Sequence, residues 1–178
     1  MTYSLLRTLI VLAMVSVPVS AQEPVFPTIK ASTLNKDKVT LPKDFSAAKN
    51  VLLISFGRDM QEVIDAWDAA LTPLRELPDQ VQVYNTPLIP NPGALVRGFI
   101  NGGFRSIYKD RSLRDRIIIL YVKEKKIFPV LGIEENDRTK PLILVISKDG
   151  TIIGRVQGLA DEDNVAAVTA FIDPKESY

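Results

Sequence analysis

The sequence predicts a mixed α/β sandwich in which helices flank one central sheet. Short apolar runs rich in β-branched residues alternate with amphipathic segments of helical spacing along most of the chain. A turn pattern near the N-terminus separates two short strands, and Asp149 with Gly150 marks a second hairpin near the C-terminus. We therefore expect parallel crossovers early in the chain and an antiparallel edge late.

Residues 1–21 have the layout of a secretory signal peptide. Arg7 is the only charge before Glu23, and the apolar run Thr8–Val19 is too short to span a bilayer comfortably. Small residues at its end suit cleavage after Ala21. We expect one exported domain, residues 22–178, which is periplasmic if the chain is bacterial. An uncleaved N-terminal segment that anchors the domain to a membrane is the alternative.

Two short strands are expected to open this domain. They lie at Phe26–Thr33 and Lys38–Pro42, on either side of turn residues 35–37. Val51–Phe56 is a continuous apolar run, which is typical of a strand buried on both faces. The domain is therefore expected to begin with a hairpin and to continue into a central strand.

An amphipathic helix is predicted after the central strand. Apolar residues recur at helical spacing over Met60–Leu74, and Asp59 is placed to cap the first turn. Pro78 stands past this pattern, and Pro73 is a position where the helix can kink or end earlier. A short strand at Val81–Tyr84 follows.

The second half of the chain is expected to supply three more strands and a closing helix. Ile117–Val122 has the pattern of a buried strand, and Leu142–Ile146 with Thr151–Val156 enclose the Asp-Gly turn. Asp161 is placed to cap the last helix.

The chain contains no cysteine and no histidine. Without a thiolate it cannot form, break or exchange disulfides. Without histidine it lacks the commonest zinc ligand and the usual base of serine and cysteine triads. The 22 basic and 21 acidic residues nearly balance, which gives no general reason to expect a nucleic-acid partner. We expect no catalytic residue, no cofactor and no metal.

Two stretches of the chain resemble a known superfamily. FPTIKASTLNKDKVTLPKDF, followed by NVLLISF, looks like the start of peroxiredoxin-like and extracytoplasmic thioredoxin-like domains. Lys140–Gly158 is similar to the later half of these domains, in which a proline precedes a strand, an Asp-Gly hairpin and a return strand. The resemblance implies a thioredoxin-like sandwich with an N-terminal β-hairpin. The loop Gly57–Gln61 stands where redox members carry the reactive cysteine, so no redox role is transferred.

A narrower resemblance concerns the family of mitochondrial ATP-synthase assembly factors and its bacterial relatives. The matching residues are Ile54, Ser55, Phe56, Trp67, Leu131, Gly132, Ile133, Asp149 and Gly150. Most of these positions carry the fold, so shared architecture alone also explains the match.

The superfamily resemblance implies a peptide groove near Pro141, which matches the cis-proline position. A cis bond there would place Lys140 and Thr139 beside the loop formed by Arg58, Asp59 and Met60, and the resemblance implies that redox relatives hold extended peptide in that groove. In this chain such a groove would bind without chemistry. The alternative is a proline that merely starts an edge strand.

A basic segment with interleaved aromatic residues is the second candidate contact surface. Its cations are Arg97, Arg105, Lys109, Arg111, Arg114 and Arg116, and its aromatic residues are Phe99, Phe104 and Tyr108. Such a cluster can dock an acidic protein surface or anionic lipid headgroups. The alternative is a solvated helix and loop whose aromatic residues face the core. Changing Arg105, Arg111 and Arg114 to Glu is expected to abolish binding and leave the fold intact.

These observations favour a redox-inactive, exported binding or assembly module for a protein partner, of open oligomeric state. A rival interpretation is an enzyme that uses carboxylate, Lys or Tyr groups, which would need a pocket with strongly perturbed pKa values. A third is a structural subunit of an envelope complex. Exposed apolar surface at Phe99, Ile100 and Phe104 would favour the third interpretation over peptide capture.

Overall fold

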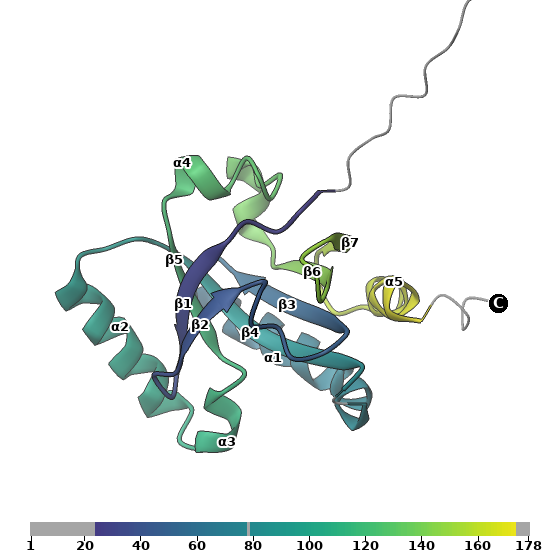
Figure 1. The fold of residues 1–178 in the computed structure, drawn as a ribbon, viewed down its shortest axis with the longest axis horizontal. Coiled ribbons are helices and arrows are strands. Elements are labelled where there is room, and N and C mark those ends of the chain that lie inside the picture. The colour runs from purple at the N-terminus through teal and green to yellow at the C-terminus, as the bar shows by residue number, and fades with distance from the viewer. Residues whose placement is uncertain (1–23, 78, 174–178) are drawn as a thin grey trace, which may run out of the picture.

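A central mixed sheet forms the middle of the molecule in the computed structural model, which describes residues 24–77 and 79–173 (Figure 1). Its seven strands lie in the order β2-β1-β5-β4-β3-β6-β7. They are β1 Ile29–Thr33, β2 Lys38–Leu41, β3 Lys49–Ser55, β4 Val81–Pro90, β5 Ile118–Val122, β6 Leu142–Ser147 and β7 Ile152–Gln157. The predicted α/β sandwich is confirmed, whereas the signal-peptide segment and Pro78 lie outside the described residues.

Helices and short 3₁₀ turns connect these strands. The helices are α1 Gln61–Ala70, α2 Ala94–Ile107, α3 Arg111–Arg114, α4 Glu124–Ile127 and α5 Glu162–Ile172. The 3₁₀ turns are Arg58–Met60, Thr72–Glu76 and Glu135–Thr139. In Figure 1, α2 and α3 stand beside the β1–β2 end of the sheet, and α5 stands beside β6 and β7.

The strand directions follow the predicted change along the chain. β3 pairs with β4, and β4 with β5, in parallel, so α1 and α2 lie in crossover connections. β6 returns antiparallel to β3 and then pairs with β7. The N-terminal hairpin β1–β2 joins the sheet through antiparallel pairing of β1 with β5.

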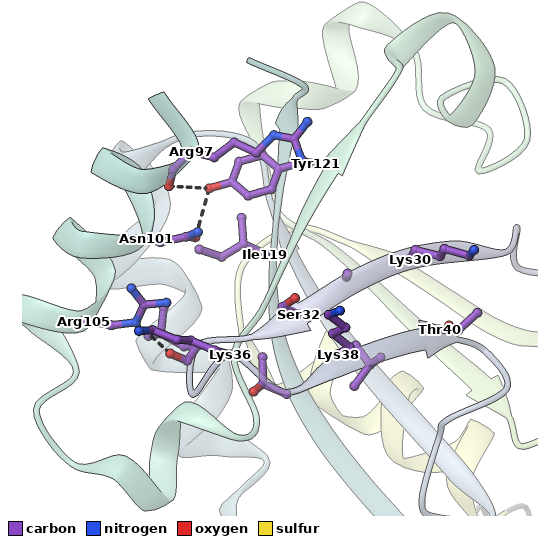
Figure 2. Close-up of a pocket in the computed structure, with 14 residues that line it drawn as sticks. Lys30, Ser32, Lys36, Lys38, Thr40, Arg97, Asn101, Arg105, Ile119 and Tyr121 are labelled. Carbon is purple, nitrogen blue, oxygen red and sulfur yellow. Dashed lines mark hydrogen bonds between the residues drawn. The ribbon is translucent and has the colours of Figure 1, made fainter. Parts of the chain in front are cut away.

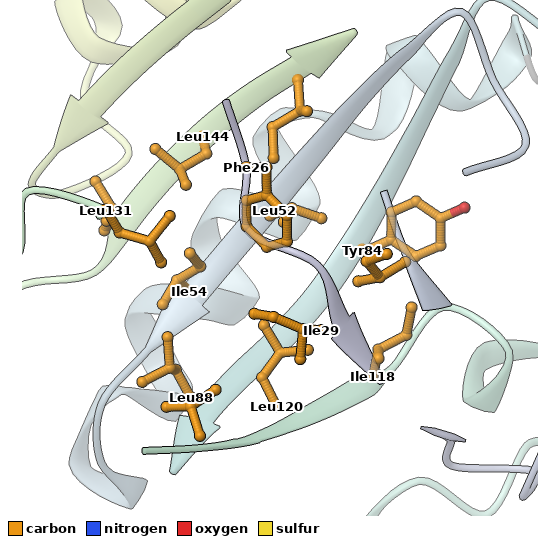
Figure 3. Close-up of a cluster of buried hydrophobic side chains, with 14 of the residues drawn as sticks. Phe26, Ile29, Leu52, Ile54, Tyr84, Leu88, Ile118, Leu120, Leu131 and Leu144 are labelled. Atoms are coloured by element: carbon orange, nitrogen blue, oxygen red, sulfur yellow. The ribbon is translucent and has the colours of Figure 1, made fainter. Parts of the chain in front are cut away.

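Both faces of the sheet are covered by apolar side chains. On one face, Val51 and Leu53 of β3 pack with Ile64 and Trp67 of α1 and with Val168 of α5. On the opposite face, a larger cluster joins the strands to the N-terminal segment and the region after β5 (Figure 3). Its labelled members are Phe26, Ile29, Leu52, Ile54, Tyr84, Leu88, Ile118, Leu120, Leu131 and Leu144. Because β3 contributes to both clusters, its continuous apolar run is explained.

The first helix differs from its predicted form at both ends. Its N-cap is Met60, which gives no side-chain cap, so the predicted capping role of Asp59 is wrong. The preceding 3₁₀ turn takes up the residues that the sequence pattern assigned to the helix start. The α-helix ends at Ala70, and Pro73 lies in the following 3₁₀ turn because a proline nitrogen cannot donate to the helical ladder.

The C-terminal part agrees closely with the sequence pattern. Asp161 is the N-cap of α5, and its Oδ1 accepts a hydrogen bond from the Asn164 backbone nitrogen at 2.9 Å. Gly150 has a φ of +99° in the β6–β7 turn, a conformation that favours glycine. Asp149 accepts a hydrogen bond from the Thr151 backbone nitrogen at 3.1 Å. These local interactions explain why this hairpin and its turn could be predicted from the sequence.

Trp67→Phe is expected to lower the free energy of unfolding by about 2–3 kcal/mol. Trp67 is 0% exposed, and its Nε1 donates to the Gly158 carbonyl at 2.9 Å. The smaller ring leaves a cavity and an unpaired carbonyl. Urea denaturation followed by circular dichroism measures the loss. Leu159→Ala, at an exposed position, is the control and should stay within about 0.5 kcal/mol of wild type; equal stability of Trp67→Phe and wild type would contradict the expectation.

Candidate functional site

The loop Gly57–Gln61 follows the C-terminal end of β3 and leads into α1. Arg58 and Asp59 are exposed, as the predicted contact role requires. The Asp59 carboxylate lies so close to Gly57 that a Cβ atom there would overlap it. Met60 is only 5% exposed, and its Sδ accepts from the Phe56 backbone nitrogen at 3.4 Å. Met60 therefore belongs to the core and not to a contact surface.

Pro141 differs from both of its predicted forms. Among the described residues the cis peptide bond is at Leu41–Pro42, so the expected cis bond at Pro141 is wrong. The edge-strand alternative is also wrong, because β6 lies between β3 and β7. Pro141 is buried, and its carbonyl accepts from the Gly158 backbone nitrogen at 3.2 Å. It ties the start of β6 to the end of β7.

Thr139 and the loop after β3 lie at the same end of the sheet. The pairing of Leu142 with Ile54 puts both segments at that end. Thr139 closes a 3₁₀ turn, and its hydroxyl donates to the Asn136 carbonyl at 3.2 Å. The pocket that opens beside Arg58 contains neither Thr139 nor Pro141 in its wall.

That pocket lies between the loop after β3 and α2, with a volume of about 420 Å³. Its wall is mainly apolar, with backbone and polar atoms of the loop at one side. It is lined by Ser55, Phe56, Gly57, Arg58, Gln61, Pro87, Ile89, Ile100, Gly103, Phe104, Ser106 and Ile107. A Cβ atom at Gly103 would stand 3.7 Å from Nη2 of Arg58, so the guanidinium reaches this turn of α2. We take this pocket and α2 as the candidate site.

α2 carries large apolar side chains that point away from the core. Leu95 is 82% exposed, Phe99 80% and Ile107 64%. Ile100 and Phe104 are half-buried against a small cluster around Ile119. The expected exposed apolar surface is therefore present at Phe99, whereas Ile100 and Phe104 face the pocket and the core.

The sequence interpretation missed the part of this surface at Leu95 and Ile107. The signal was present, because Leu95 and Phe99 are four residues apart, and Ile100, Phe104 and Ile107 follow helical spacing. Two apolar stripes on one helix cannot both face the same sheet. The many cations of the same segment favoured the prediction of an electrostatic contact surface over an apolar one.

The arginines of the basic segment mainly bind backbone carbonyls. Arg105 Nε donates to the Leu34 carbonyl at 2.9 Å. Arg114 donates from Nε to the Tyr108 carbonyl at 2.6 Å and from Nη2 to the Arg105 carbonyl at 3.0 Å. Changing Arg105 or Arg114 to Glu removes these bonds. We therefore expect this reversal to lower the free energy of unfolding as well as to change the charge of the segment.

The remaining cations of the segment are differently placed. Arg97 donates from Nε to the Pro92 carbonyl at 3.2 Å, and its guanidinium carbon lies 5.3 Å from the centre of the Tyr121 ring. Lys109 and Arg111 are exposed, and within the described ranges neither side chain forms an ion pair. These two are the cations of the segment most available to an acidic surface.

Tyr108 joins α1, β4 and the end of α2. Its hydroxyl accepts hydrogen bonds from Gln61 Nε2 at 2.7 Å and from Asn85 Nδ2 at 3.3 Å. Its ring is nearly parallel to that of Phe104, with centroids 6.5 Å apart. Burial raises the pKa of the phenol. Tyr108 therefore acts as a connecting residue between three elements.

Comparison with solved structures identifies the architecture. A thiol:disulfide interchange protein from Bacteroides sp. superposes with a TM-score of 0.58 at 13% identity, over 88% of this chain and 93% of that chain. The fold is thioredoxin-like. The exposed lipoprotein thioredoxin of Streptococcus pneumoniae matches with a TM-score of 0.56 at 12% identity, over 83% of this chain and 99% of that one. BsSco, a member of the Sco family of cytochrome c oxidase assembly proteins, matches with a TM-score of 0.56 at 10% identity, over 84% and 94%.

No family model matches the sequence, and no curated protein matches it either. The resemblance to the ATP-synthase assembly factors therefore stays a prediction. Over residues 24–77 and 79–173, no group of three or more acidic side chains is arranged to hold a metal ion. None of the helices in those ranges has the length and apolar character needed to cross a membrane.

Arg114→Met is expected to lower the free energy of unfolding by about 1–2 kcal/mol, because two carbonyls at the end of α2 lose a charged donor. Arg111→Met, three residues away on the exposed side of α3, is the matched control and should change it by less than about 0.5 kcal/mol. Urea denaturation of both variants gives the comparison. Equal losses would show that Arg114 does not anchor the helix.

Stability is expected to fall as the pH rises above about 10, the ordinary tyrosine pKa. The folded-state pKa of Tyr108 is raised by burial, so the unfolded chain ionises first, and the stabilisation present below that pH is lost as the pH rises through the folded pKa. Urea denaturation at alkaline pH should show a weaker pH dependence for Tyr108→Phe than for wild type. Identical pH dependence in the two proteins would show that the Tyr108 phenol does not contribute to the change in the free energy of unfolding.

Proposed function

We propose that this chain is an exported, redox-inactive thioredoxin-like module that binds a protein partner through α2 and the pocket beside Gly57. The absence of cysteine and histidine from a thioredoxin-like fold supports a binding role over thiol chemistry. The observation that carries the proposal is the exposure of Leu95, Phe99 and Ile107 on the helix that forms one wall of the pocket.

The energy available to such a contact is substantial. Covering a large apolar side chain contributes about 1.5–3 kcal/mol, and three such side chains stand on one helix. The pocket between Pro87, Ile89 and Phe104 offers apolar walls to a side chain of the partner. An exposed aromatic residue beside an apolar pocket is a common centre of protein interfaces.

Arg58 and Gln61 are the polar groups that can set the orientation of the partner. Both line the pocket, on the side of the loop after β3. A guanidinium is suited to a carboxylate or to backbone carbonyls of an incoming segment. The apolar surface of α2 thus supplies most of the affinity, and Arg58 and Gln61 determine the orientation of the bound partner.

An assembly role is the form of binding that we favour. BsSco, which is described as a member of a family of cytochrome c oxidase assembly proteins, shows that a protein of this fold can serve in assembly. The similarity to BsSco is one of fold, so the assembly role of this chain is proposed by analogy. A structural subunit of an envelope complex would use the same apolar surface of α2, and Phe99 would then be permanently covered. A non-thiol enzyme remains the rival from another class.

Leu95→Ser with Phe99→Ser is expected to abolish capture of the partner. The tagged protein and this variant are used to isolate bound proteins from the native envelope fraction, and these are identified by mass spectrometry. Both side chains are exposed, so the variant should keep its folding free energy within about 0.5 kcal/mol.

Val130→Ser with Leu159→Ser is the matched control. It removes two exposed apolar side chains elsewhere on the surface, and it should retain the partner. A partner held equally by wild type and by the α2 variant would contradict the proposal. Loss of the partner from both variants would show that general surface hydrophobicity, and not α2, causes the capture.

A further inference from the structure

A second cavity, of about 600 Å³, lies on the other side of α2, between this helix and the N-terminal hairpin. Figure 2 shows Lys30, Ser32, Lys38 and Thr40 along the hairpin and Asn101 and Arg105 on the helix. Ile119 and Tyr121 of β5 lie between them. The cavity therefore has a floor of sheet and two walls from segments far apart in the sequence.

The strand register places the hairpin side chains on one face. Lys30 pairs with Thr40, and Ser32 pairs with Lys38, so these four side chains point to the same side of the ribbon. Ser32 also pairs with Ile119 of β5, which continues that face into the sheet. Lys30, Ser32 and Lys38 are exposed, so this face of β1 and β2 remains open.

The charges around the cavity all have one sign. Five cations line it, and no acidic residue does. The five are Lys30, Lys36, Lys38, Arg97 and Arg105. In the part of the chain that the structure describes, none of them belongs to a salt bridge. Such a concentration of unpaired positive charge attracts anions and is relieved when one binds.

The two arginines are held in place before any ligand arrives. Arg105 is fixed by its bond from Nε to the Leu34 carbonyl, and within residues 24–77 and 79–173 its other guanidinium nitrogens have no protein acceptor. The Arg97 guanidinium lies over the Tyr121 ring. The Tyr121 hydroxyl in turn donates to Asn101 Oδ1 at 3.1 Å. Preorganised donors lose little entropy on binding.

Neutral donors and apolar surface complete the cavity. The Ser32 and Thr40 hydroxyls and the Asn101 amide can donate hydrogen bonds to an anion. Ile119 and the Tyr121 ring supply apolar contacts. A concave site of this size suits a small molecule better than a folded acidic protein surface.

We propose that this cavity binds a ligand that carries phosphate groups, either a soluble phosphorylated molecule or the headgroup of a phospholipid. Phosphate presents more negative charge and more acceptor oxygens than a single carboxylate, and it matches a site with several guanidinium, ammonium and hydroxyl donors. Arg97, Asn101 and Arg105 recur every four residues on one side of α2, apart from the apolar residues of the protein-binding proposal. This site therefore does not depend on that proposal.

Isothermal titration calorimetry of the purified protein with sodium pyrophosphate, at constant ionic strength, tests the proposal. Lys36→Asn with Lys38→Thr should weaken pyrophosphate binding on the order of tenfold. Lys36 has a φ of +80°, which Asn tolerates, and Thr suits the strand position of Lys38. Both substitutions thus remove charge without opposing the local backbone conformation.

Lys125→Gln with Lys126→Gln in α4 is the control, because it makes the same change in net charge away from the cavity. It should retain pyrophosphate affinity within about twofold. Equal weakening by both variants would overturn the proposal in favour of non-specific attraction. Sodium succinate is expected to bind more weakly than pyrophosphate, and equal binding would overturn the preference for phosphate.

Vesicle sedimentation separates the two sources of phosphate. Vesicles of phosphatidylcholine with phosphatidylglycerol are compared with vesicles of phosphatidylcholine alone. Sedimentation that needs phosphatidylglycerol and is lost in Lys36→Asn/Lys38→Thr assigns the site to a phospholipid headgroup. Pyrophosphate binding without such sedimentation assigns the site to a soluble phosphorylated ligand. If the protein neither binds pyrophosphate nor sediments with the phosphatidylglycerol vesicles, the proposal is overturned.

Discussion

Guanidinium-to-carbonyl hydrogen bonds hold α2 against the rest of the molecule, and the candidate surfaces depend on them. No residue of this helix is fully buried, so apolar packing alone does not fix its position. Arg105 joins it to the β1–β2 turn at Leu34, and Arg114 joins its C-terminal end to α3. A charged donor on a carbonyl forms a stronger bond than a neutral one. The helix can therefore carry apolar side chains outward and still keep its place.

Much of the fold could be predicted because its signals are local. The Asp-Gly turn, the cap at Asp161 and the apolar runs of the central strands each depend on neighbouring residues. The length of β4 could not be predicted in this way. Its second half contains Asn85 and Pro87, which disfavour a strand, but between them the Thr86 hydroxyl donates to the Leu53 carbonyl at 3.2 Å on the adjacent strand. That compensation exists only after the sheet has formed.

The candidate site was harder to predict for a related reason. An arginine in a sequence does not reveal whether it will face an acidic partner, solvent or a carbonyl of its own chain. Arg105 and Arg114 bind carbonyls, whereas Lys109 and Arg111 stay exposed. The role of Pro141 likewise depends on strand order, because only the sheet shows that it starts an internal strand. The hairpin lysines line a cavity only because α2 lies opposite them, and that arrangement cannot be deduced from the local sequence.

The position of α2 between two cavities has a thermodynamic consequence. One side of the helix contributes Arg97, Asn101 and Arg105 to the basic cavity, and another contributes Ile100, Phe104 and Ile107 to the apolar pocket. A shift of the helix that improved binding on one side would alter the geometry on the other. Linkage would then require each ligand to change the affinity of the other by the same factor. A single helix can in this way make occupancy of the two cavities interdependent without any additional moving part.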